Sequence, residues 1–273
     1  MGKFVKFDSD KCIGCGLCVD DCISKIIKVE NNLAYIENFQ YCIKCGHCGA
    51  VCPEDAITFE NIFKEDIVEY EEEIREIDFH RLNAFIKMKR STRQYLDKSI
   101  DNKILKSILE VGRVSPTGGN RQPLKFIVVS TPENMEKLKI MAMKSLSDLS
   151  EKVNGRYKEV FANILPDYLE DDYDRLFYNA PALIVVYGDP NESGSLFVDA
   201  GIAAGQMSLI GNSLGLGSCF IGFLNTASLN DNKINEFLGI PDDHKMITNI
   251  IFGYPNVEYF RTVPRNMLDV IYM

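Results

Sequence analysis

The chain has 273 residues, of which 46% are hydrophobic, and a formal net charge of -9. That length and apolar content are enough for two domains, one of them with a sizeable core. The acidic balance argues against nucleic acid as a partner, and the most apolar run, residues 182–187, is too short to cross a membrane.

Cysteine spacing is the strongest feature of the first 60 residues. The pattern Cys-x2-Cys-x2-Cys-x3-Cys occurs twice, and every cysteine of the second copy lies 30 positions after its counterpart in the first. This spacing is typical of iron–sulfur ligation, in which three closely spaced thiolates hold one cluster and the fourth reaches the other. The two predicted ligand sets therefore cross over: Cys12, Cys15, Cys18 and Cys52 for the first cluster, and Cys42, Cys45, Cys48 and Cys22 for the second.

Residues 5–30 and 35–60 form an internal repeat that resembles the bacterial two-[4Fe–4S] ferredoxins. Pro53 follows Cys52 as that family's pattern expects, whereas Ile23 follows Cys22 in place of the usual proline. The alternatives fit less well, since disulfides need an oxidising compartment and zinc sites use paired rather than triple cysteine spacing. We therefore expect residues 1–60 to form a two-[4Fe–4S] ferredoxin domain that has little apolar core and does not fold without iron.

An acidic stretch over residues 61–80, which includes the run at residues 71–73, is predicted to connect this domain to a second one at residues 81–273. The second domain alternates helical and strand patterns, which predicts an α+β or α/β fold class. Thr131 before Pro132 marks the start of a helix, and Gly215 marks the end of another. The predicted helices cover residues 78–90, 101–113, 132–148 and 195–214. The predicted strands cover residues 125–130, 182–187, 217–221 and 246–252.

Two of these helices have further expected features. Ile104, Ile108 and Val111 are expected on one face of the helix at 101–113. The small residues of the helix at 195–214 are expected to let another helix approach it closely; they are Gly201, Ala203, Ala204 and Gly205.

Two polar segments of the second domain suggest a phosphate-containing ligand. Three cations and two hydroxyls converge at residues 89–93, a composition that suits a phosphate monoester, although a basic run of this length is usually a solvated face. Residues 115–123 form a loop rich in turn formers before a strand. Its Asn120 and Gln122 offer the paired donors and acceptors that the pyrimidine edge of a flavin needs. The alternative is an ordinary helix-to-strand loop.

Residues 81–273 resemble the FMN-dependent nitroreductase family, because four motifs of that family occur here in the same order. They are the basic run at 89–93, the loop Ser115–Pro123, a glycine- and alanine-rich helix leading to Gly222, and the ending Gly253-Tyr254-Pro255. The resemblance implies an α/β sandwich and a homodimer with each FMN at its interface. Leu124 stands where that family often has an aromatic residue, so substrate preference is not carried over.

The resemblance also implies roles for particular residues. Lys89, Arg90, Ser91 and Arg93 would hold the FMN phosphate and ribityl chain. Either Arg261 or Arg265 would close on the phosphate. The residues expected along the flavin are Pro116, Thr117, Gly118, Asn120, Gln122, Ile221 and Gly222, with Asn120 and Gln122 belonging to this or the partner subunit. No catalytic residue is predicted, and Cys219 is expected to be a small buried residue rather than a nucleophile.

Together, the two domains predict a cytoplasmic oxidoreductase that carries two [4Fe–4S] clusters and FMN. Electrons would pass between the clusters and FMN to reduce a small organic acceptor such as a nitroaromatic or a quinone, with a donor protein or NAD(P)H as the source. The alternative is an electron-transfer or redox-sensing flavoprotein without a small substrate. A domain that has lost the flavin and binds another phosphate is the least favoured reading.

Overall fold

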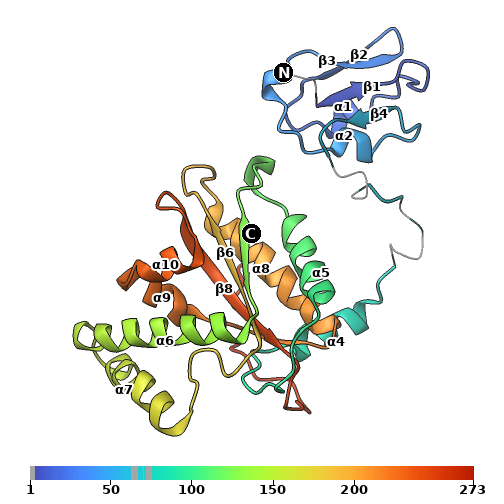
Figure 1. Ribbon diagram of the computed structural model, residues 1–273. Coiled ribbons are helices and arrows are strands. Elements are labelled where there is room, and N and C mark those ends of the chain that lie inside the picture. Colours follow the sequence, from blue (N-terminus) through green and yellow to red (C-terminus); the bar gives the residue numbers. More distant parts are fainter. Residues whose placement is uncertain (1–3, 63–66, 70, 72–75) are drawn as a thin grey trace. The chain divides into compact units, whose positions relative to one another are not determined.

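The computed structural model describes residues 4–62, 67–69, 71 and 76–273. The described residues fall into two compact units: the first comprises residues up to 76 together with 119–121, and the second comprises the rest of residues 77–273. Figure 1 shows the elements of both units in chain order. Part of the predicted connector at residues 61–80, namely residues 63–66, 70 and 72–75, lies outside the described residues.

The first unit contains two small antiparallel sheets. Strand β1 (Val5–Phe7) pairs with β4 (Ile57–Phe59), and β2 (Ile27–Glu30) pairs with β3 (Leu33–Ile36). The helical segments are short: α1 (Leu17–Asp21), η1 (Phe39–Tyr41) and α2 (His47–Ala50). Helices α1 and α2 begin 30 residues apart, as do β2 and β4, so the repeat of the sequence is also a repeat of structure.

The apolar core of the first unit is small. Its fully buried members are Val5, Cys18, Ile26, Ile27, Ala34 and Ile57. Five other cysteines, Cys12, Cys22, Cys42, Cys48 and Cys52, are only partly buried and pack around this core. So small a core stabilises a fold only weakly, which makes bound metal the main candidate for the remaining stability.

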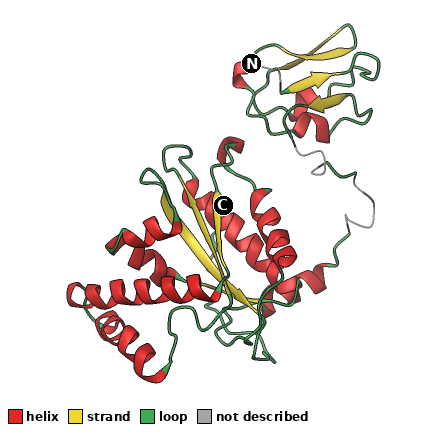
Figure 2. Cartoon of the chain, viewed as in Figure 1, coloured by secondary structure: helices red, strands yellow, loops and turns green. Residues whose placement is uncertain are grey.

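The second unit is built on a four-stranded sheet in the order β5-β6-β8-β7, with every neighbouring pair antiparallel. The strands are β5 (Lys125–Val129), β6 (Ala182–Gly188), β7 (Gly217–Phe220) and β8 (Lys245–Gly253). Strand β6 is almost entirely buried because both faces of the sheet are covered (Figure 2). Its side chains alternate between two cores, with Leu183 and Val185 in one and Ile184 and Val186 in the other.

Helices form the two outer layers of this unit. The bounds are α4 (Phe79–Met88), α5 (Asn102–Arg113), η3 (Gly118–Asn120), α6 (Pro132–Leu149), η4 (Ser150–Lys152), α7 (Arg156–Asp171), α8 (Leu196–Ser213), α9 (Gly222–Asn230) and α10 (Lys233–Leu238). One core joins the sheet to α6, α7, α9 and α10, and the other joins it to α5 and α8. In the described part of the chain, no helix combines the length and apolar character needed to cross a bilayer.

The structure confirms the four predicted helices and four predicted strands within one or two residues, and it corrects two details. The buried residues of α5 are Leu105, Ile108 and Gly112, so the buried face is rotated from the predicted one. Of the four small residues expected at a close helix contact on α8, Ala203 and Ala204 are fully buried, whereas a Cβ atom added at Gly201 or Gly205 would have no neighbouring atom within 4 Å. Helices α5 and α8 instead come close at Gly112, where a Cβ atom would lie 2.5 Å from Met207 Sδ.

A buried ion pair fixes the segment that leads into β6. Lys139 Nζ lies 3.3 Å from Asp174 Oδ2 and 3.1 Å from Glu136 Oε2. Asp174 in turn accepts hydrogen bonds from the backbone amides of residues 176, 177 and 179. Burial lowers the pKa of Lys139, but its acidic and phenolic neighbours raise the pKa by more, so the ammonium form is retained.

Replacing Lys139 by methionine is expected to destabilise the second unit by about 3 kcal/mol, because it leaves the Asp174 carboxylate buried without its cation. For a unit of this size the melting temperature should fall by roughly 6–12 °C. Thermal unfolding followed by circular dichroism measures the shift. Lys144, exposed on the same helix, supplies the matched control Lys144→Met, which should move the transition little.

Candidate cofactor sites

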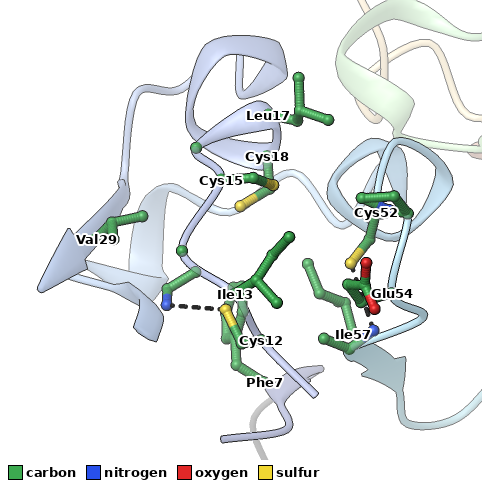
Figure 3. A pocket seen from close by; sticks show the side chains of 15 residues that line it. Phe7, Cys12, Ile13, Cys15, Leu17, Cys18, Val29, Cys52, Glu54 and Ile57 are labelled. Atoms are coloured by element: carbon green, nitrogen blue, oxygen red, sulfur yellow. Dashed lines mark hydrogen bonds between the residues drawn. The ribbon is translucent and has the colours of Figure 1, made fainter. Parts of the chain in front are cut away.

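Two cavities of the first unit each gather four cysteines. The first is lined by Cys12, Cys15, Cys18 and Cys52 (Figure 3). The second is lined by Cys22, Cys42, Cys45 and Cys48. These groups are the two crossed sets expected from the sequence. The structure thus brings the members of each set together, and their role as ligands remains a prediction.

The chemistry of the two cavities suits clusters with several iron atoms. Sulfur is the donor that iron–sulfur clusters use, and each cavity offers four thiols among apolar side chains. Among the described residues, no group of three or more His, Cys, Asp or Glu side chains is arranged to hold a metal ion by itself.

Burial keeps the free thiols protonated. Burial raises the pKa of the Cys48 thiol to about 11 and also raises the pKa of Cys18, with neighbouring cysteines adding to both shifts. Backbone amides reach two other sulfur atoms, since Ala34 N donates to Cys12 Sγ at 3.5 Å and Ala56 N donates to Cys52 Sγ at 3.4 Å. A bound cluster would replace the thiol protons, and such amides would stabilise the resulting thiolates.

In the second unit, residues 89–93 run from the end of α4 to the edge of β7. Ser91 forms a parallel bridge with Ser218, and Thr92 N donates to Ser218 O at 3.0 Å. This pairing fixes the backbone on which the predicted phosphate-binding side chains stand. Burial lowers the pKa of Lys89, so its cation would gain from a neighbouring anion.

Arg90 is the best-supported side chain of this segment. Its Nη2 atom donates to the backbone oxygen of Arg261 at 2.5 Å, and its guanidinium carbon lies 4.5 Å from the centre of the Tyr259 ring. Its Nε atom is buried and has no hydrogen-bond partner among the described residues. A buried, unpaired donor on a fixed guanidinium fits a phosphate or ribityl oxygen, because Arg presents a planar array of donors to such groups.

The tail residues Arg261 and Arg265 are both exposed, and the structure brings only the backbone of Arg261 to Arg90.

Arg93 lies 5.9 Å from the centre of the Tyr178 ring. Tyr178 has a positive φ of 54°, unusual for a bulky side chain, in the segment that Asp174 anchors. Sequence reasoning missed both Tyr178 and Tyr259, since neither belongs to a motif.

The loop at residues 115–123 is fixed mainly by Asp199, in the first turn of α8. This carboxylate, 2% exposed, accepts a hydrogen bond from Gly118 N at 3.0 Å and further ones from Ser193 Oγ and Ser195 Oγ at 3.1 and 3.3 Å. Any side chain at position 118 would collide, because a Cβ atom there would lie 2.0 Å from Ser195 Oγ. Asp199 is the only charged residue in the sequence of α8, and this isolation could have indicated its role.

The remaining predicted loop residues lie on a tightly turned backbone. Thr117 Oγ1 accepts a hydrogen bond from Gln122 N at 3.0 Å, while Asn120 and Gln122 have φ values of 52° and 50°. Pro116 is exposed. Loops of successive tight turns present backbone amides to a ligand, in keeping with the predicted contact to a flavin.

At the end of β7, the predicted pair Ile221 and Gly222 divides into two roles. The Ile221 amide already donates to Asn249 O at 3.2 Å. Gly222 begins α9, and the first amides of a helix have no partner within it. Gly222 is therefore the better donor to a ligand. Cys219, two residues before Ile221, is buried as expected.

A pair of four-thiol cavities and a separate unit with a desolvated cationic segment together define an iron–sulfur protein with a second cofactor-binding unit. Residues 86–254 match the model of the nitroreductase family, and residues 11–57 match that of the 4Fe-4S dicluster domain. The chain belongs to the nitroreductase family. The predicted family, fold, ferredoxin-type domain and oxidoreductase class are thereby confirmed.

Individual relatives agree with both matches. A putative NADH dehydrogenase/NAD(P)H nitroreductase from Archaeoglobus fulgidus is 29% identical over 174 residues, which cover 62% of this chain and 83% of the relative. An uncharacterized ferredoxin from Methanocaldococcus jannaschii is 42% identical over 60 residues, covering 21% of this chain and 78% of the relative. A solved nitroreductase with bound FMN from Bacteroides fragilis has a TM-score of 0.57 at 25% identity, and the match covers 70% of this chain and 98% of that structure.

Proposed function

We propose that this protein passes electrons between two [4Fe–4S] clusters and FMN and reduces a small organic acceptor such as a nitroaromatic or a quinone. The observation that carries the proposal is the presence, in one chain, of two four-thiol cavities and of a buried, unpaired Arg90 donor in a nitroreductase-family unit. The FMN-bound relatives of known structure support FMN as the second cofactor.

FMN exchanges electrons one at a time or in pairs, which would join one-electron iron–sulfur chemistry to the reduction of an organic molecule. Lys89, Arg90 and Arg93 would bind its phosphate, and Ser91 would hydrogen-bond to the phosphate or ribityl chain. The loop fixed by Asp199 and the first amides of α9 would hold the ring. The tail arginines 261 and 265 remain candidates for closing the site.

A homodimer is part of the proposal, with Asn120 and Gln122 serving the flavin of this or the partner subunit. Exposed apolar side chains support it. They occur on α8, at Phe197 and Val198, and in the tail, at Leu268, Ile271 and Tyr272. Exposed apolar residues in such groups favour association. All nine cysteines are free of disulfides, which supports a cytoplasmic location.

An anaerobic titration tests the function. The purified protein is mixed with reduced ferredoxin or, separately, with NADPH or NADH, and flavin absorbance is followed before and after a nitroaromatic is added. Cluster-dependent bleaching that the nitroaromatic reverses would support the proposal. Rapid bleaching by a nicotinamide after the cysteine ligands are removed would make the flavin the entry point. Bleaching that no organic acceptor reverses would favour the electron-transfer alternative.

Replacing Asp199 by asparagine is expected to weaken FMN binding about tenfold. An amide cannot accept from Gly118 N, Ser193 and Ser195 as a carboxylate does, and losing a hydrogen bond to a charged group costs about 1.5–3 kcal/mol. Fluorescence titration of flavin-free protein with FMN measures the change. Asp148→Asn, at an exposed position on α6, is the control. Unchanged FMN affinity in Asp199→Asn would show that the loop does not need this carboxylate.

A further inference from the structure

The internal repeat lets the two cysteine cavities be compared position by position. Residues 30 apart line the two cavities in equivalent places, for example Ile13 with Ile43 and Gly16 with Gly46. A cluster in either cavity would therefore meet nearly the same apolar and backbone surroundings. Where the residues at equivalent positions differ, the surroundings of the two clusters would differ as well.

The clearest difference is in charge. Glu54 lines the first cavity, where Ser24 is the equivalent residue of the second, and Lys44 lines the second, where Gly14 is the equivalent residue of the first. Figure 3 shows Glu54 beside Cys52. Among the described residues that line the two cavities, Glu54 and Lys44 are the only Asp, Glu, Lys or Arg. The first cavity thus carries one negative charge and the second one positive charge.

Hydrogen bonds to sulfur do not reverse this contrast. The first set receives the long contacts from Ala34 and Ala56 to Cys12 and Cys52, at 3.5 and 3.4 Å. Burial raises the pKa of Cys18 in the first set and of Cys48 in the second, and a backbone amide opposes each shift, that of Cys18 itself and that of Gly49. Amide dipoles are therefore present on both sides, whereas the two formal charges act in the same direction. Reduction adds one negative charge to a cluster, which a nearby cation favours and a nearby carboxylate opposes.

We propose that the cluster held by Cys22, Cys42, Cys45 and Cys48 has the more positive reduction potential, and that Lys44 and Glu54 set the order. In the singly reduced unit the electron then rests on this second cluster. The exchange is one electron: the first cluster is oxidised, the second is reduced, and no proton or bond is transferred. The inference rests on the cluster binding of the proposed function, but not on its organic acceptor.

A potentiometric titration followed by electron paramagnetic resonance tests this order in the intact protein under anaerobic conditions, with dithionite as the reductant. The wild-type protein is expected to show two one-electron cluster waves. Lys44→Gln should lower only the more positive wave, and Glu54→Gln should raise only the more negative one. Each shift should change the reduction equilibrium by about threefold or more, where tenfold corresponds to about 59 mV for one electron.

Lys28→Gln and Glu37→Gln, at exposed positions of the same unit that line neither cavity, are the matched controls and should leave both waves in place. Lys44→Gly is a second variant that the backbone accepts, since Lys44 has a φ of 55° and its counterpart Gly14 has one of 69°. Iron content confirms that each variant holds both clusters.

Three results would overturn the inference: a single unresolved cluster wave, a Lys44→Gln effect on the more negative wave, or waves that neither charge variant moves. A failure of the proposed function is a separate result. If the two reduction waves follow the proposed order but the protein reduces no organic acceptor, this inference stands. The proposed activity would then be wrong.

Discussion

Replacing Arg90 by glutamine is expected to weaken FMN binding by about 10- to 100-fold. The guanidinium is held by Arg261 O and by the Tyr259 ring, and its buried Nε lacks a partner within the described protein. One or two hydrogen bonds between a charged donor and a phosphate oxygen contribute about 1.5–3 kcal/mol each, and about 1.4 kcal/mol is tenfold in affinity. Fluorescence titration of flavin-free protein gives the dissociation constant.

Two further substitutions separate charge from geometry at this site. Arg90→Lys keeps the cation but loses the planar array of donors, so its affinity should fall between those of Arg90→Gln and the wild type. Lys87→Gln removes an exposed cation three residues earlier, near the end of α4, and should change little. If Arg90→Gln bound FMN as tightly as the wild type, Arg90 would not belong to the flavin site.

Anaerobic removal of iron by a chelator is expected to unfold the first unit and to leave the second intact. The first unit has six fully buried core residues and two-stranded sheets, and its centre consists of cavities lined with cysteines. In such small domains the free energy of metal binding supplies most of the stability of the fold. The second unit has two extensive cores of its own and contains none of the predicted iron ligands.

Hydrogen exchange read by mass spectrometry resolves the two units in the intact chain. Amides of residues 5–59 should lose protection after chelation, while those of β6 and β8 should keep it. Adding iron and sulfide back should restore the protection. If residues 5–59 remained protected without iron, the apolar core of the first unit would be sufficient by itself.

Strong local patterns made most of the fold predictable. The apolar, β-branched run at residues 182–187 gave a strand buried on both faces, and Thr131, Pro132 and Gly215 marked helix ends that the structure confirms, with Thr131 Oγ1 accepting from Asn134 N. Helix α7 was missed. It contains Pro166, which usually interrupts a helix, and it is held by the buried side chains of Phe161 and Ile164. Tertiary packing of this kind leaves little local signal.

The candidate site divides in the same way. Cysteine spacing was enough to predict which thiols share each cavity, because short loops limit how far a ligand can reach. Tyr259 lies 169 positions after Arg90 in the chain. The two residues meet because the tail returns to the segment that Ser91 joins to β7, with Pro255 bridged to Tyr95. No local pattern could have indicated that contact. Ile221 was predicted to lie along the flavin, and the bond from its amide to Asn249 O depends on strand register, which local sequence does not give.

Rapid mixing of the fully reduced protein with a nitroaromatic tests the central claim most directly. Cluster and flavin absorbance are followed together in the wild-type protein and in flavin-free Arg90→Gln. If electrons pass between the clusters and FMN, the acceptor should reoxidise the wild-type clusters promptly and those of the flavin-free protein at least about tenfold more slowly. Equal cluster reoxidation in both proteins would show that the clusters reach the acceptor without FMN, and would contradict the account.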